Sequence, residues 1–435
     1  MDFELHHTFR NWSHTIDFKP GRFCRPQSEA DVVRLVQAAD QGGERVRIQG
    51  AGHSFSQLLP TDGTLATLDE IPPAITVNGR SVTVSAGIRL KNLIKELKSR
   101  GLGLKNLGSI TEQSIAGATA TGTHGTGLRL GSLSSQIESV RLVTGTGAVK
   151  TIAPAAGDDF EAARMGLGLL GVLTEVTLSC VDHYKLEYSA YLTTFDHVLP
   201  QIETLIQENE RILLWWLVPP AGPRDCVIVI TKNPLGHPPG ILGGAQDGVV
   251  PLASGLLQAL LPQDGNHLAT LAASAGVPSA GFKRIWHRVD DYEDILTIPL
   301  LPIFHRECEY AVPVNNTREA LRQMRRVFDE GDVSLRLPVE VRFLASDSAL
   351  ISPSRGRDVA YIGASTLDNA TEVFERFEPL MRDLEGRPHW GKNFTLTRSE
   401  VARMYGSGYT RFCEVRREFD PNGVFLNSFL AGYFE

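Results

Sequence analysis

The sequence is poor in cysteine, and the few cysteines present do not pair. They are five in number, an odd count, and no Cys-x-x-Cys spacing or metal-ligand spacing occurs among them. Such scattered thiols fit a reducing compartment better than a secreted, disulfide-stabilised fold. The five are Cys24, Cys180, Cys226, Cys308 and Cys413.

Basic blocks, a signal peptide and a long apolar run are also absent. The net charge of −7 disfavours nucleic acid and anionic membranes as partners. Residues 1–7 lack the basic-then-apolar pattern of a secretory signal. Residues 240–281 are apolar-rich, but Asp247, Pro251 and Pro262 interrupt them before the ~18 apolar residues of a spanning helix accumulate. We therefore expect a cytoplasmic protein with neither a membrane nor a nucleic-acid partner.

What the chain does have is a glycine loop that ends in a histidine. A strand pattern, Arg45–Gln49, leads into Gly50, Ala51, Gly52, His53 and Ser54. Glycines allow a sharp turn and expose backbone N–H groups to an anion such as a pyrophosphate, and a histidine held there can act as a nucleophile. A purely structural turn is the common alternative.

A second loop of the same character follows about sixty residues later. Gly117, Thr121, Gly122, Thr123 and His124 belong to it. Gly108, Ser109 and Ser114 precede it. Either loop alone would pass for a Gly/Thr-rich surface loop, but the two together indicate one large polyanionic cofactor held from two sides.

Residues 166–171 spell Gly-x-Gly-x-x-Gly, yet they do not predict a nicotinamide site. That site requires a strand before the glycines and a helix after them. Here a helical pattern from Asp158 precedes the glycines, and a strand pattern over Val172–Val181 follows. The order is reversed, which excludes a Rossmann site.

Charged residues near the C-terminus suggest where chemistry occurs. Glu340 and Arg342 lie two apart in a strand pattern, so both side chains emerge on one face. Val339, Val341 and Phe343 give the other face an apolar, buried character. An exposed ion pair is the ordinary alternative, but this pattern favours a pair that faces a polar cavity.

Four ordered motifs resemble one family. They are the loop ending at His53, the block Pro338–Phe343, the run Gly386–Lys392 and the stretch Phe412–Leu430. Together they are similar to the aldonolactone oxidase (L-gulonolactone oxidase-like) and alditol oxidase branch of the vanillyl-alcohol oxidase superfamily of FAD-linked oxidoreductases. The resemblance covers nearly the whole chain and is weakest over 234–281.

The resemblance implies an α+β protein of two domains, as the length of 435 residues also suggests. It assigns 1–183 to an FAD-binding domain, 184–385 to a substrate-binding cap, and 386–435 to a segment that returns to the FAD domain. Alternating apolar runs in the cap, including Glu309–Val314 and Val359–Ile362, predict an antiparallel sheet with helices on one face.

The resemblance also assigns roles to residues. FAD would be attached covalently to His53 through its 8α-methyl carbon. Ser109, Glu340, Arg342 and Lys392 would be catalytic and, with Ser365, would contact substrate; no metal is expected. The remaining FAD contacts implied are Gly50, Ala51, Gly52, Ser54, Gly108, Ser109, Ser114, Gly117, Thr121, Gly122, Thr123, His124, Gly171, Val172 and Lys392.

The implied reaction is oxidation of a sugar γ-lactone, such as L-gulono-1,4-lactone, at C2. Hydride would pass to flavin N5 and then to oxygen, giving hydrogen peroxide and an ascorbate-type product. An alditol oxidase acting on xylitol or sorbitol is the alternative, weakened because Gly363 and Ser365 stand where that group has histidine and threonine. A dehydrogenase with another acceptor, and a flavin- or sugar-binding protein without turnover, also remain open.

Overall fold

The computed structural model describes residues 2–218, 225–247, 276–278, 280–298, 303–331, 333 and 335–435. Among these residues, no helix combines the length and apolar character needed to cross a bilayer. Most of the apolar-rich stretch 240–281 lies outside the described residues.

The first part of the chain forms a small mixed sheet with a long helix beside it. Its order is β1-β4-β6-β5, with β4, β6 and β5 parallel. The helix begins after Ser28, whose side chain accepts from the Asp31 N–H, and ends where Gly43 adopts a left-handed conformation. The elements are β1 (Phe3–Glu4), β4 (Arg22–Cys24), β6 (Thr64–Thr67), β5 (Val46–Gln49) and α1 (Glu29–Gly42).

A five-stranded antiparallel sheet follows, in the order β11-β10-β12-β8-β7. Helix α2 packs four buried apolar residues against it, as their spacing predicts. Helix α4 precedes β12, so the Gly166–Gly171 segment does run from a helix to a strand. The elements are β7 (Ile75–Asn78), β8 (Ser81–Ser85), α2 (Leu90–Lys98), β10 (Ile137–Val143), β11 (Val149–Ile152), α4 (Asp158–Ala163) and β12 (Val172–Ser179).

The middle of the chain builds a nine-stranded sheet in the described residues, antiparallel except where β17 meets β18. Its last strand, at residues 387–388, comes from the C-terminal segment. In spatial order the strands are β17 (Gln246–Asp247), β18 (Lys283–Asp291), β14 (Lys185–Thr194), β16 (Cys226–Pro234), β15 (Ile212–Leu217), β20 (Val339–Leu344), β21 (Val359–Thr366), β19 (Arg306–Pro313) and β22 (Arg387–Pro388).

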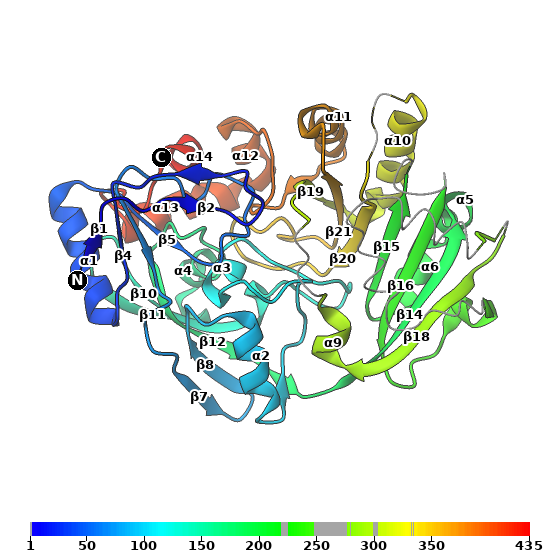
Figure 1. The fold of residues 1–435 in the computed structure, drawn as a ribbon, viewed down its shortest axis with the longest axis horizontal. Helices are drawn as coiled ribbons and strands as arrows, with labels where there is room; N and C mark the ends of the chain where they lie inside the picture. The colour runs from blue at the N-terminus through cyan, green and yellow to red at the C-terminus, as the bar shows by residue number, and fades with distance from the viewer. Residues whose placement is uncertain are drawn as a thin grey trace.

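One face of this sheet is covered by helices, on the far side from the first two sheets (Figure 1). Val339, Val341 and Phe343 share a hydrophobic core with these helices, so the residues between them point toward the first half of the chain. The expectation of a two-domain α+β protein with an antiparallel cap sheet is confirmed. The covering helices are α5 (Phe195–Val198), α6 (Ile202–Glu208), α10 (Thr317–Asp329) and α11 (Ala370–Asp383).

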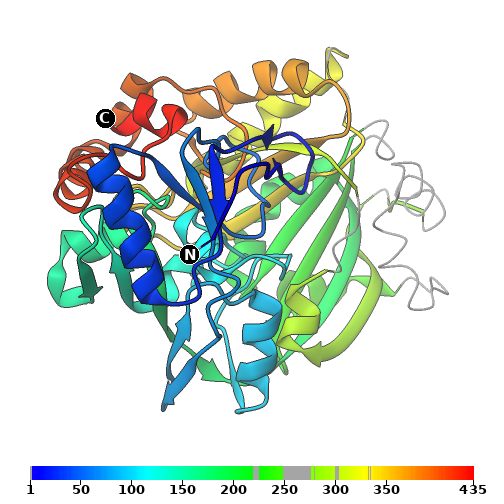
Figure 2. The same ribbon diagram turned by 60° about the vertical axis from the view of Figure 1, so that its left-hand side comes forward.

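The C-terminal segment returns to the first half of the chain (Figures 1 and 2). The Val46 N–H donates to the Val424 carbonyl at 2.8 Å. The fully buried Asp420 carboxylate accepts from the N–H groups of Val424 and Phe425 at 2.7 and 2.9 Å. The segment's helices are α12 (Arg398–Tyr405), α13 (Ser407–Phe419) and α14 (Ser428–Phe434).

Replacing Asp420 should therefore loosen this return. In Asp420→Ala two buried N–H groups lose their acceptor, which should cost about 2–4 kcal/mol of the free energy of unfolding. Asp420→Asn keeps one acceptor oxygen and should lose about half as much. Denaturant unfolding measures both, with Glu70→Ala, which removes an exposed carboxylate, as the matched control. Equal midpoints for the alanine variant and the control would contradict the prediction.

Candidate active site

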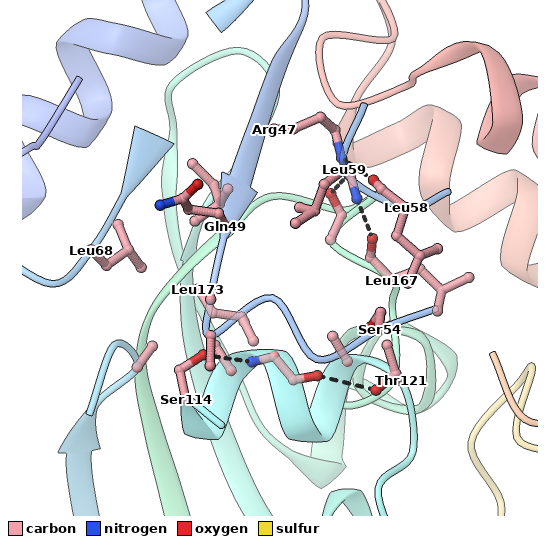
Figure 3. A pocket seen from close by; sticks show the side chains of 18 of the residues that line it. Arg47, Gln49, Ser54, Leu58, Leu59, Leu68, Ser114, Thr121, Leu167 and Leu173 are labelled. Atoms are coloured by element: carbon pink, nitrogen blue, oxygen red, sulfur yellow. Dashed lines mark hydrogen bonds between the residues drawn. The ribbon is translucent and has the colours of Figure 1, made fainter. Parts of the chain in front are cut away.

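The two glycine loops line one deep cleft of about 1300 Å³ (Figure 3). The first loop enters from the end of β5. The second contributes the short helix α3 (Ile115–Ala120), whose N-cap Ser114 accepts from the Gly117 N–H at 3.3 Å. Segment 166–172 closes a further side of the cleft. The loops that the sequence paired are thus brought together.

Glycine is required where the loops approach each other. A Cβ on Gly50 would lie 2.6 Å from the Ser114 hydroxyl, and Gly52 has a φ of +70°. Neither position accepts a side chain without a shift of the backbone or its neighbour. The narrow separation keeps backbone amides close to whatever occupies the cleft.

Arg47 ties the cleft walls together, a role that the sequence alone did not reveal. Its guanidinium donates to the carbonyls of Leu58, Leu167 and Phe425 at 2.9, 2.9 and 2.7 Å (Figure 3 shows the first two). Burial lowers the pKa of Arg47 to about 10, although Asp420 acts in the opposite direction. Three distant segments are thereby held around the cleft.

His53 lies where this cleft meets a second cavity. It lines both, as do Ser54, Gln113 and Thr121. Burial lowers the pKa of His53 to about 4, so its imidazole is neutral at physiological pH. The Trp12 ring packs against it, with the ring centroids 5.7 Å apart. A neutral, partly buried imidazole is the form that can act as a nucleophile.

The second cavity lies on the sheet face opposite the helices. Strand register explains its polar wall. Glu340 on β20 pairs with Gly363 on β21, and Gly363 pairs on its other side with Glu309 on β19. Ser365 pairs with Glu307 one step along the same face. Side chains at these positions emerge side by side over the cavity.

Arg342 connects the cap sheet to the second loop. It forms an ion pair with Glu340 and donates to the Ser109 hydroxyl at 2.7 Å. The Trp215 indole N–H donates to the other Glu340 oxygen at 2.9 Å. Burial opposes the charge of Arg342, but Glu340, together with Glu309 and Glu307, outweighs it, so the pKa of the guanidinium is raised. Three of the four predicted catalytic residues therefore form one hydrogen-bonded unit.

Lys392, the fourth predicted catalytic residue, lines the same cavity and forms an ion pair with Glu307. Burial opposes ionisation of Glu307, but the Lys392 ammonium lowers the pKa of that carboxyl to about 2. Burial lowers the pKa of Lys392, but Glu307 and, to a smaller extent, Glu309 raise it above its usual value. Both groups are charged at neutral pH.

A buried histidine cluster completes the wall. His124 stacks on Tyr361 with ring centroids 3.7 Å apart and faces Glu309 at 3.6 Å. His389 accepts from the Gly391 N–H at 3.0 Å, and burial lowers its pKa to about 3. His124, Glu309 and His389 lie close enough to share a cation, but the neighbouring Lys392 ammonium opposes one.

The structure divides the predicted cofactor residues between the two cavities. Gly108, Ser109, Thr123, His124 and Lys392 line the second cavity, and Gly122 lines neither. Ser365 lines the second cavity with the predicted catalytic residues. Those lining the first cleft are Gly50, Ala51, Gly52, His53, Ser54, Ser114, Gly117, Thr121, Gly171 and Val172.

The first cleft fits a large polar cofactor. The buried side-chain oxygens of Gln49 and Gln113 have no hydrogen-bond partner within the protein, and both residues line it. Buried polar atoms of this kind are normally satisfied, so they indicate a bound group with donors to offer. FAD, with ring N–H and hydroxyl donors and a pyrophosphate for the loop amides, matches this lining.

Glu307 and Glu309 were missed from the sequence, although a signal was present. Polar and apolar residues alternate from Glu307 through Cys308 and Glu309 to Tyr310, as they do over Val339–Phe343. A strand was predicted to begin only at Glu309, so its polar face was not considered. Trp215 stands in the apolar stretch 212–218, which gives no sign that its indole N–H donates to Glu340.

Comparison with known proteins decides the family. Residues 20–153 match an FAD binding domain, and residues 176–433 match the D-arabinono-1,4-lactone oxidase family. The chain belongs to that family. It is a member of the vanillyl-alcohol oxidase superfamily, an FAD-dependent oxidoreductase acting on CH–OH groups.

Relatives at moderate identity cover almost the full chain. An L-gulono-1,4-lactone dehydrogenase of Mycobacterium tuberculosis is 33% identical, over 96% of this chain and 97% of its own. An L-gulonolactone oxidase of Bos taurus is 30% identical, over 98% of both chains. The solved cholesterol oxidase from B. sterolicum has a TM-score of 0.79 at 19% identity, covering 98% of this chain and 96% of its own, which shows a shared fold.

Proposed function

We propose that the protein oxidises a sugar γ-lactone such as L-gulono-1,4-lactone at C2, with oxygen as acceptor. The observation that carries this is that the unit of Glu340, Arg342 and Ser109 lines the same cavity as Lys392, and that this cavity shares His53 with the cofactor cleft. The product would be of the ascorbate type. Relatives named as gulonolactone and arabinonolactone enzymes support the substrate class.

In this proposal Glu340 holds the reacting hydroxyl and takes its proton as the C–H bond breaks. Arg342 and Ser109 lower the cost of negative charge on that oxygen, because a guanidinium and a hydroxyl both donate to it. Lys392 places a second positive charge in the lining of the cavity. The Ser365 hydroxyl lies on the same sheet face and offers a further contact for a sugar hydroxyl.

The cofactor would be held by the two glycine loops, by segment 166–172 and by His53. FAD bound there supplies the hydride acceptor at its N5 atom. The backbone amides of the loops and the unpartnered oxygens of Gln49 and Gln113 are the groups of this chain that would meet it.

A substrate panel tests the proposal. L-gulono-1,4-lactone, D-arabinono-1,4-lactone, xylitol and sorbitol would each be mixed with the enzyme, without oxygen to follow flavin bleaching and with oxygen to follow peroxide. The lactones should bleach the flavin. Bleaching by the alditols alone would replace the proposal with an alditol oxidase, and no bleaching by any would favour a binding protein.

We further propose that FAD is linked covalently to His53, since its neutral imidazole lies where the two cavities join. Acid-precipitated protein should then retain the flavin, and the denatured band should fluoresce. His53→Ala should release all of it. Because the imidazole is neutral down to its pKa of about 4, attachment to apoprotein should proceed equally fast at pH 6 and pH 8. Complete release from the wild type would exclude the link.

Glu340→Gln and Lys392→Ala should each slow anaerobic flavin reduction by about 10²–10³-fold, because each removes a group assigned to the transition state. Flavin content should stay normal, since neither residue lines the first cleft. Stopped-flow absorbance measures the rate. The matched control is Glu385→Gln, an exposed carboxylate in the turn after α11. Near-normal rates in both active-site variants would remove them from the mechanism.

The proposal of oxygen as acceptor rests on Gly108, which lines the second cavity without a side chain. Reduced enzyme should reoxidise rapidly, and Gly108→Ala should slow this by obstructing access. The structure adds a constraint, because the new Cβ would lie 2.8 Å from the Thr123 methyl. Thr123→Ser removes that methyl and keeps the hydroxyl to which Gln113 donates.

Stopped-flow reoxidation should therefore compare Gly108→Ala, Thr123→Ser and the double variant with the wild type. Slow reoxidation of Gly108→Ala and of the double variant, together with fast reoxidation of Thr123→Ser, would support obstruction of oxygen by the added carbon. Slow wild-type reoxidation, with turnover only on a dye, would make the protein a dehydrogenase, as the mycobacterial relative is named.

A further inference from the structure

Glu307 holds the lysine segment with both its main chain and its side chain. The Asn393 N–H and the Asn393 side-chain amide both donate to the Glu307 carbonyl at 2.9 Å. The Glu307 carboxylate forms the ion pair with Lys392. A residue that fixes the backbone beside Lys392 and also binds its ammonium determines where that charge lies.

The other groups around Lys392 oppose one another. Arg342 on β20 repels the ammonium, and Glu309 attracts it from farther along β19. Glu309 itself faces His124, at 3.6 Å. His53 and His389 are both neutral because burial lowers their pKa values, and the Phe55 ring centroid lies 5.2 Å from the Lys392 nitrogen. His305 lies 3.7 Å from the same Glu307 carboxylate oxygen, Oε2, that pairs with Lys392.

We propose that Glu307 is a positioning residue for the oxidation, holding the Lys392 ammonium in place and keeping it protonated. The inference rests on the proposed function, which assigns Lys392 to the transition state. Glu307 is the carboxylate that contacts this amine, and the cavity that contains the pair also contains a second cation, Arg342. Without Glu307, Lys392 would keep a repulsive neighbour and lose its nearest attractive one.

The sign of the consequence follows from electrostatics. Burial disfavours a charged amine and Glu307 is the largest influence that raises the pKa of Lys392. Removing the carboxylate charge lowers that pKa, so the protonated amine persists at low pH and is lost as pH rises through the new value. If the reaction needs protonated Lys392, the activity of such a variant should therefore fall roughly tenfold for each pH unit above the lowered pKa of Lys392.

Two readouts test this on flavin-loaded protein. Glu307→Gln removes the charge, Glu307→Asp keeps it on a shorter side chain, and Glu309→Gln is the matched control on the same strand face. The first readout is the pH dependence of cyanate labelling at Lys392, quantified by peptide mass spectrometry. Cyanate reacts with the neutral amine, and the Lys392 side chain is 22% exposed, so the reagent can reach it.

Labelling of Lys392 in Glu307→Gln should rise at least tenfold over the wild type at pH 8, with Glu307→Asp intermediate and Glu309→Gln closer to the wild type. The second readout is anaerobic flavin reduction by L-gulono-1,4-lactone across pH 6–9. Glu307→Gln should slow progressively with rising pH, whereas a merely structural loss would lower the rate equally at every pH.

The outcomes separate this inference from the proposed function. Labelling curves that coincide in the wild type and Glu307→Gln would overturn it. A shifted labelling curve with an unchanged pH profile of reduction would show that Glu307 keeps Lys392 protonated, but it would remove both residues from the oxidation and so overturn the proposed positioning role. Should Glu307→Gln fail to fold, coincident curves for Glu307→Asp and the wild type would overturn it equally.

Discussion

Neutralisation of charge in a confined space is the constraint on which the active site depends. The side chains of Arg342 and Lys392 are largely buried, and an unpaired cation removed from water costs several kcal/mol. Each is therefore matched by a carboxylate from the same sheet, Glu340 or Glu307. The sheet can supply both because alternate residues of β19 and β20 point away from the helices. The polar wall exists only while the strands keep this register.

That register also links the two halves of the chain. Arg342 donates to Ser109 from the second glycine loop, and the Gly127 N–H donates to the Phe343 carbonyl at the end of the same strand. Ile298, beyond the helix that packs on β14 and β18, donates through its N–H to the Ser109 carbonyl. The cap is therefore hydrogen-bonded to the second glycine loop, which lies between the two cavities. A shift of β20 would displace both the substrate wall and part of the cofactor wall.

Much of the site followed from local patterns in the sequence. The alternation around Glu340 and Arg342 was enough to predict their common face, and the glycine loops predicted a cofactor cleft, because each depends on neighbours close in the chain. The alternation over Glu307–Tyr310 could place Glu307 on the polar face of a strand, but it could not identify the partners of its carboxylate. Its significance comes from pairing with Ser365 and from the ion pair with Lys392, contacts across 58 and 85 residues that no local period encodes. The same holds for Arg47, whose three carbonyl partners come from separate segments.

The internal pairing has a consequence for which form of a substrate can enter. Glu307, Glu309 and Glu340 face two permanent cations in the described lining, and each cation already has a carboxylate partner. A γ-lactone is uncharged and can offer hydroxyls to these groups, whereas its hydrolysed acid brings a further negative charge with no vacant counter-ion. Lactones open slowly in water, so only the molecules that are still closed would bind in the cavity. Hydrolysis would then lower the concentration of substrate, but the open acid that it produces would not inhibit the enzyme.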